Sequence, residues 1–356
     1  MRIAGSSANH PSCRFLITKV CSSKMLMNEG NDFIGSAFIW DSHSGFESRP
    51  DARLEQLETW RSAGVSYLSV NVGYDVRSWE NTISTLASFR RQIRSLGDLY
   101  ILVETVADID RARKANKLAI SFDIEGMESL DGNVDMVSFY YDLGVRQMLF
   151  AYNLNNRAGG GCHDKDVGLT RFGRDVIAQM NSVGMLIDCS HSAYKTTMEA
   201  MEVSADPVIF SHSNPRGLVD HGRNIVDEQI TGCAATGGVI GINGIGLFLG
   251  GSIAPEAFVD HTVYVAELVG AEHVGLGLDY ADEEEAGDID DVFQANRDYW
   301  PPDQYKDSIG GFMSPEKIPH VTEQLFSRGF SQSEISGILG GNFRRVAERV
   351  WKESDF

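Results

Sequence analysis

The chain has 356 residues, of which 42% are hydrophobic and 23% charged, so it has the composition of a globular protein with a large core rather than of a disordered or low-complexity one. Its 31 basic and 50 acidic residues give a net charge of −19, and a field of that sign repels nucleic-acid phosphates and anionic lipid. We therefore expect neither nucleic acid nor a membrane surface among its partners.

The N-terminal region differs from the remainder of the chain. It has four basic residues and no acid before Glu29, and its apolar block at 15–18 is too short for a secretory signal. We expect residues 1–30 to be a disordered extension, or sequence upstream of a natural start at Met25 or Met27, and residues 31–356 to form one domain. The five cysteines are odd in number and form no CxxC pair, which favours free thiols and a cytoplasmic location.

Short apolar runs rich in β-branched residues alternate with amphipathic stretches along the chain. A run that is hydrophobic throughout is typical of a parallel strand covered on both faces. Apolar residues at helical spacing predict the intervening helices, with Asp108 as the N-cap of one of them. The predicted helices are 52–63, 81–96, 109–116, 172–183, 193–203 and 255–269. The predicted strands are 36–40, 65–72, 118–124, 145–151, 184–187, 207–210, 238–242 and 273–278.

This alternation predicts an α/β fold, a (β/α)8 TIM-type barrel in which eight strands each lead into a helical or loop connection. The alternative is a doubly wound sheet with an appendage. An acidic, aromatic segment follows the last strand at 281–312, and two further helices are predicted within 315–351. We expect these helices to be a C-terminal extension of the same domain.

Polar side chains fall where several predicted strands end, which is where a barrel of this kind forms its active site. They include His43, Glu125, His191, His212 and Asp279. A single histidine at a strand end is commonly structural, and a single aspartate there commonly caps the next helix. The five together indicate a metal site, and imidazole and carboxylate ligands suit Zn²⁺ or a similar divalent ion.

Seven segments that contain these residues resemble, in order, the motifs of the membrane dipeptidase (renal dipeptidase) family of metallopeptidases. The resemblance extends roughly from residue 38 to residue 351. It implies a (β/α)8 barrel with two zinc ions that hydrolyses dipeptides, in several members with a C-terminal D-residue, and it implies a homodimer. The matching segments are 40–43, 123–126, 186–191, 207–213, 221–225, 275–280 and 339–346.

The resemblance also implies a role for each residue. Glu125 would bridge the two zinc ions, His191 and His212 would bind one ion, and His43 would bind the other. Asp279 would accept a proton from the attacking water and return it to the leaving amine. Arg223 would hold the free carboxylate of the substrate, because a guanidinium can bind a carboxylate through two hydrogen bonds.

The chain departs from the family pattern after its first strand. The family usually has His-x-Asp there, whereas this chain has Gly45 in place of the aspartate. We therefore expect the first zinc site to be weakened, with Asp41, Glu47 and His163 as candidates for the missing ligand.

A second departure lies after the fourth predicted strand, where the family has a histidine that stabilises the oxyanion. This chain has Tyr152 at that position. A phenol can donate one hydrogen bond but carries no positive charge. We expect Tyr152 to contact the substrate and to act on its carbonyl oxygen.

The sequence thus predicts a zinc-dependent dipeptidase that acts on a small dipeptide-like substrate. One alternative is a metal-dependent hydrolase of another carboxylate-bearing amide, such as an N-acyl amino acid or a cyclic amide. Another is a homologue that binds metal or peptide without catalysis. An amine-blocked substrate separates the first two predictions, and the metal content tests the third.

Overall fold

The computed structural model describes residues 33–45, 47–281, 292–305 and 309–353. Contacts divide the chain into two units, Met1–Ala37 and Phe38–Phe356. In the first unit the described residues include one helical turn at 33–36. The predicted extension at 1–30 lies outside the described residues, and the second unit contains all the strands described below.

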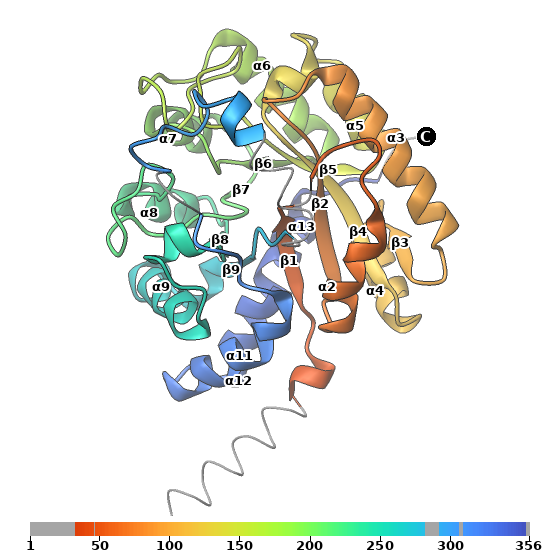
Figure 1. Cartoon of the computed structure of the whole chain (residues 1–356), viewed down its shortest axis with the longest axis vertical. Helices are drawn as coiled ribbons and strands as arrows, with labels where there is room; N and C mark the ends of the chain where they lie inside the picture. The colour runs from red at the N-terminus through yellow and green to blue at the C-terminus, as the bar shows by residue number, and fades with distance from the viewer. Residues whose placement is uncertain (1–32, 46, 282–291, 306–308, 354–356) are drawn as a thin grey trace, which may run out of the picture. The chain divides into compact units, whose positions relative to one another are not determined.

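The second unit is a (β/α)8 barrel of parallel strands surrounded by helices (Figure 1). Its wall has the strand order β7-β6-β5-β4-β2-β1-β9-β8. A parallel bridge between Phe210 and Ile240 joins the two ends, and the Gly241 N–H donates to the Phe210 carbonyl over 2.7 Å. The described strands are β1 (Trp40–Ser44), β2 (Tyr67–Tyr74), β3 (Tyr100–Leu102), β4 (Leu118–Glu125), β5 (Val145–Leu149), β6 (Leu186–Asp188), β7 (Val208–Ile209), β8 (Ile240–Asn243) and β9 (Val274–Gly277).

Two strands differ from the prediction. The first was expected at 36–40, but β1 begins at Trp40 and consists mostly of buried polar residues. Hydrophobicity locates strands that are covered by apolar neighbours, so it missed a strand with a polar interior face. The short strand β3 was not predicted. It pairs with the first half of β4, and β5 pairs with the second half of β4 along the same edge.

Helices connect most of the strands and surround the barrel wall (Figure 1). Helix α6 shows the usual signals: the Thr170 hydroxyl accepts from the Gly173 N–H over 3.1 Å, and Gly184 ends the helix at a φ of 87°. The helices are α2 (Glu58–Ser62), α3 (Trp79–Ser95), α4 (Val106–Lys114), α5 (Met136–Asp142), α6 (Arg171–Val183), α7 (Tyr194–Val203), α8 (Asp227–Ala235), α9 (Pro255–Val269), α11 (Ile318–Ser327), α12 (Gln332–Ser336) and α13 (Asn342–Val350).

The prediction that Asp108 is an N-cap was wrong, because α4 begins one turn earlier. Thr105 is the N-cap, and Asp108 is the third residue of the helix. Its carboxylate accepts the backbone N–H groups of Glu104 and Thr105 over 2.8 and 2.9 Å. Asp108, a residue within the helix, therefore accepts hydrogen bonds from backbone N–H groups just before the helix, as in a capping box.

The C-terminal helical region closes one end of the barrel. The first residues of β1 and β2, Trp40 and Tyr67, stack with ring centroids 3.6 Å apart, and Phe343 of α13 stacks on Trp40 from 6.3 Å. These rings and the apolar face of α13 form one buried cluster. The opposite end, where the parallel strands finish, is thereby left for the polar side chains. No helix in the described part of the chain is both long enough and apolar enough to cross a bilayer.

Candidate metal centre

The predicted ligands meet at the carboxyl ends of the strands. His43 lies in β1, and Glu125 is the last residue of β4. His191 and His212 each lie three residues beyond the ends of β6 and β7. All four side chains are nearly inaccessible to solvent. The barrel thus gathers residues that are up to 169 positions apart in the chain.

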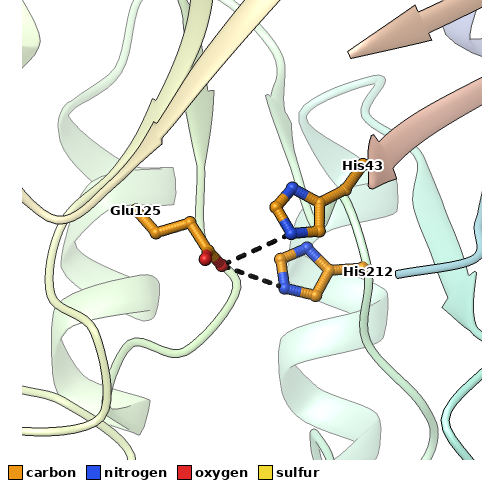
Figure 2. A group of neighbouring side chains, drawn as sticks. All are labelled: His43, Glu125 and His212. Carbon is orange, nitrogen blue, oxygen red and sulfur yellow. Dashed lines mark ion pairs between the residues drawn. The ribbon is translucent and has the colours of Figure 1, made fainter. Parts of the chain in front are cut away.

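Three imidazole rings lie close to one carboxylate oxygen of Glu125. The Nε2 atoms of His191 and His212 lie 3.3 Å from Glu125 Oε1, and that of His43 lies 3.7 Å from it. Figure 2 shows the rings of His43 and His212 turned toward this carboxylate. Glu125 Oε1 is buried without a hydrogen-bond partner. An orphaned carboxylate oxygen facing imidazole nitrogens fits a bound cation.

The other nitrogen of each ring is held by a protein group. His43 Nδ1 lies 3.2 Å from Asp123 Oδ1, and His191 Nδ1 lies 2.7 Å from Asn153 Oδ1. His212 Nδ1 lies 2.6 Å from the Ser211 hydroxyl, which itself donates to Asp188. Each Nδ1 therefore has an acceptor for its proton, which directs the Nε2 atoms toward the cavity. Those of His191 and His212 lie 3.0 Å apart, close enough to bind one cation.

Burial shifts the pKa values of the side chains in this cluster. It raises the pKa of Glu125 to about 8 and lowers the pKa of His191 and His212 well below the usual value. Burial also acts to lower the pKa of His43, but the carboxylates of Asp123 and Glu125 hold it well above its usual value. Burial thus favours the neutral imidazoles of His191 and His212, the form in which histidine binds Zn²⁺.

Asp279 lies beside these ligands, two residues beyond β9. It has a φ of 52°, a left-handed conformation that is uncommon outside glycine and asparagine. Its Oδ2 accepts from the Asn243 amide over 2.9 Å, and its Oδ1 lies 3.5 Å from His43 Nε2. The carboxylate is thus held in the cavity with one oxygen directed at the cluster.

The structure leaves no space for the missing carboxylate at Gly45. A Cβ atom there would lie 2.7 Å from the Asp279 carbonyl oxygen. The suggested replacements have other partners. Asp41 accepts from the Trp60 indole and the Leu278 N–H, and Glu47 pairs with Arg77 and Arg49. His163 Nε2 lies 2.9 Å from the Tyr305 hydroxyl.

Arg223 is buried beside the ligands rather than exposed in a surface loop. Its terminal nitrogens donate to the His212 carbonyl over 2.7 Å and the Ser213 hydroxyl over 3.0 Å. Its Nε is buried without a hydrogen-bond partner. Each terminal nitrogen carries a second N–H, so the guanidinium can hold the protein and still bind an anion. Arg223 lines a polar cavity that adjoins the main one at His191.

Tyr152 lies over the ligands. Its ring stacks on that of His191, with centroids 4.3 Å apart and 24° between the planes. Burial, reinforced by the Glu125 charge, raises its pKa well above the usual value, so the phenol keeps its proton. It is therefore placed as a neutral hydrogen-bond donor at the edge of the cavity.

Several supporting residues were not predicted as part of the site. Asp75 accepts the Tyr152 N–H over 3.1 Å and an Asn156 N–H over 2.8 Å, which positions the loop that carries Tyr152. Asn243 holds Asp279, and Asn153 holds His191. Asp75 and Asn243 also come at the ends of strands. The signal that identified the ligands could have located them, but an amide or a single acid is a weaker indicator than a histidine.

The sequence of this chain is similar to those of known dipeptidases. Residues 61–297 match the model of a family described as membrane dipeptidase (peptidase family M19). An uncharacterized dipeptidase of Schizosaccharomyces pombe is 30% identical over 249 residues, which are 67% of this chain and 54% of that protein. Mouse dipeptidase 3 is 28% identical over 271 residues, 72% of this chain and 50% of that protein. The chain thus spans about half the length of these relatives.

A solved structure shows the same architecture over almost the whole chain. It is an amidohydrolase from Pseudomonas aeruginosa, with a TM-score of 0.81 and 26% identity. The match covers 90% of this chain and 99% of that one.

Proposed function

Because the chain belongs to the membrane dipeptidase family, we propose that it is a zinc-dependent dipeptidase that cleaves the amide bond of L,L- or L,D-dipeptides. The observation that carries this proposal is the convergence of three imidazole nitrogens on the unpartnered Glu125 oxygen. Zinc held by His43, Glu125, His191 and His212 would supply a nucleophile at neutral pH and polarise the scissile carbonyl. We expect two ions, with the His43 ion bound more weakly because Gly45 offers no carboxylate.

The residues around the ligands supply the remaining parts of the reaction. Asp279 takes the proton of the attacking water and delivers it to the leaving amine, since its Oδ1 faces the ligands while Asn243 holds its Oδ2. Tyr152 donates a hydrogen bond to the oxygen on which negative charge develops. Arg223 binds the carboxylate of the substrate, which restricts the enzyme to short peptides. A homodimeric state and a cytoplasmic location stay predictions from the sequence.

A panel of L,L- and L,D-dipeptides with added Zn²⁺ tests the proposal. We expect metal-dependent hydrolysis of at least one member, and the Glu125→Gln variant should lose about 100-fold or more of kcat/KM because a neutral amide is a poor ligand. The matched control is Glu80→Gln on the exposed surface of α3, which should behave like the parent.

Two further measurements separate this function from the alternatives. Hydrolysis of N-acetylated amino acids but not of free dipeptides would indicate the other class of amide hydrolase. Bound metal without turnover of any substrate, with Glu125→Gln behaving like the parent, would contradict catalysis.

A further inference from the structure

The cavity above the metal ligands has a wall of aromatic rings. The rings belong to segments far apart in the chain, from the end of β2 to the region beyond β9. Further apolar lining comes from aliphatic side chains, including Ile245 and Val292. The aromatic wall includes the rings of Tyr74, Tyr152, Phe248, Phe293, Trp300 and Phe312.

Neighbouring rings hold this wall in place. The rings of Phe293 and Trp300 have centroids 4.1 Å apart. Tyr152 meets Trp300 edge-on at 5.8 Å and Tyr74 edge-on at 5.3 Å. Such contacts fix ring orientation, so the wall is formed before a ligand arrives. Tyr74, Tyr152 and Phe293 remain partly exposed, which leaves apolar surface for a ligand to cover.

Charge is scarce on this wall. Apart from the metal ligands and Asp279, Glu47 is the only charged residue among the described residues that line the cavity. Its Oε1 lies 3.1 Å from Arg77 and 3.4 Å from Arg49, so its charge is already compensated. A charged substrate side chain would lose its water here without gaining an uncommitted ionic partner among the described residues, which costs free energy. An apolar side chain would gain free energy by covering the rings.

The position of Arg223 indicates which end of the substrate meets the wall. Arg223 lines the adjoining cavity, and His191 lines both that cavity and the aromatic one. A dipeptide whose carboxylate reaches Arg223 places its scissile bond at the metal ligands and its amino-terminal residue beside the rings. We propose, resting on the dipeptidase function above, that the protein selects dipeptides with a bulky apolar amino-terminal side chain.

The test is a series of X-Ala dipeptides in which X is Phe, Leu, Gly, Lys or Glu. Phe-Ala and Leu-Ala should exceed the other three in kcat/KM by about tenfold or more, since burying such a side chain is worth more than one factor of ten. A flat series, or a preference for Lys or Glu, would overturn the inference while leaving the dipeptidase function intact.

A substitution in the wall tests the same inference independently. Phe293→Ala should lower the ratio of kcat/KM for Phe-Ala over Gly-Ala by about five- to tenfold, because it removes one ring from the wall. The matched control is Phe139→Ala on α5, where the ring is 46% exposed, and this variant should keep the parental ratio. An unchanged ratio in Phe293→Ala would contradict the proposed contact.

If no dipeptide is hydrolysed, the dipeptidase function fails and binding still tests the selectivity. Calorimetric titration of the zinc-loaded parent with Phe-Ala and Gly-Ala should then give a dissociation constant about tenfold lower for Phe-Ala. Equal affinity, or binding of neither peptide, would overturn the inference.

Discussion

At the scale of single residues, the candidate metal centre depends on groups outside the set of candidate ligands. Asn153 fixes the tautomer of His191, because its amide nitrogen donates to the Tyr299 carbonyl over 2.9 Å and its oxygen is thereby left to accept from Nδ1. Asn153 has a φ of 62°, which asparagine tolerates better than most residues. The asparagine is thus suited both to the backbone turn and to the imidazole.

Asn153→Ala should weaken metal binding without unfolding the protein. The loss of the Nδ1 acceptor should reduce metal affinity by about 10- to 100-fold, the usual effect of removing an outer-shell partner. Competition with a chromogenic chelator measures this affinity. Asn116→Ala is the matched control, since Asn116 has a similar φ of 55° and lies outside the site. Equal affinity in the two variants would show that Asn153 does not act on the metal.

At the scale of elements, helix α9 carries a buried histidine. His261 is 3% exposed, and its Nδ1 is buried without a hydrogen-bond partner. Burial lowers its pKa to about 4. In the unfolded chain the imidazole takes up a proton below about pH 6.5, whereas in the folded protein it does so only near pH 4. The folded state therefore loses stability as the pH falls through this window.

His261→Leu should remove this part of the pH dependence. Between pH 7.5 and pH 5 the parent should lose about 2 kcal/mol more unfolding free energy than the variant, which follows from a pKa near 4 in the folded state. Urea denaturation at the two pH values measures the difference. His320→Leu, at an exposed position of α11, is the control and should keep the parental dependence. An identical pH dependence in all three proteins would contradict the buried neutral imidazole.

At the scale of the whole molecule, the two ends of the barrel differ: apolar side chains pack at one end, and the polar residues of the candidate site lie at the other. The starts of β1 and β2 are covered by the apolar face of α13, and the carboxyl ends bring the polar residues together. The interior between these ends is tight. A Cβ atom on Gly277 would lie 1.9 Å from the Ser211 carbonyl oxygen, so only glycine fits there. The ligands are therefore held by strands from all around the barrel wall.

Metal removal should lower the stability of the entire barrel. A ligand that binds only the folded state stabilises it, and four converging donors exist only when β1, β4 and the segments after β6 and β7 are in place. We expect an excess of chelator to lower the midpoint of thermal unfolding by about 5 °C or more and zinc to restore it. The shift should be smaller in Glu125→Gln. A midpoint that does not respond to chelator in the parent would argue against a metal at these residues.

The order of the strands and the grouping of the candidate ligands could be predicted from the sequence. Seven of the eight predicted strands overlap observed ones by two residues or more, because buried parallel strands are apolar throughout. Histidines and acids directly after such runs predicted His43, Glu125, His191, His212 and Asp279 as one group, and the barrel brings them together. These signals are local in the sequence, and the closure of the barrel brings the residues that carry them to one place.

Other features were decided only by the tertiary structure. The polar strand β1 and the short strand β3 depend on partners supplied by the barrel, so local hydrophobicity did not locate them. The space at Gly45 is taken by the Asp279 main chain, which is 234 residues away. The aromatic wall unites rings from β2 to the segment after β9. Residue type and local pattern thus determined the fold class and the chemistry of the candidate ligands. Contacts between distant segments decided which side chains are available and what surrounds them.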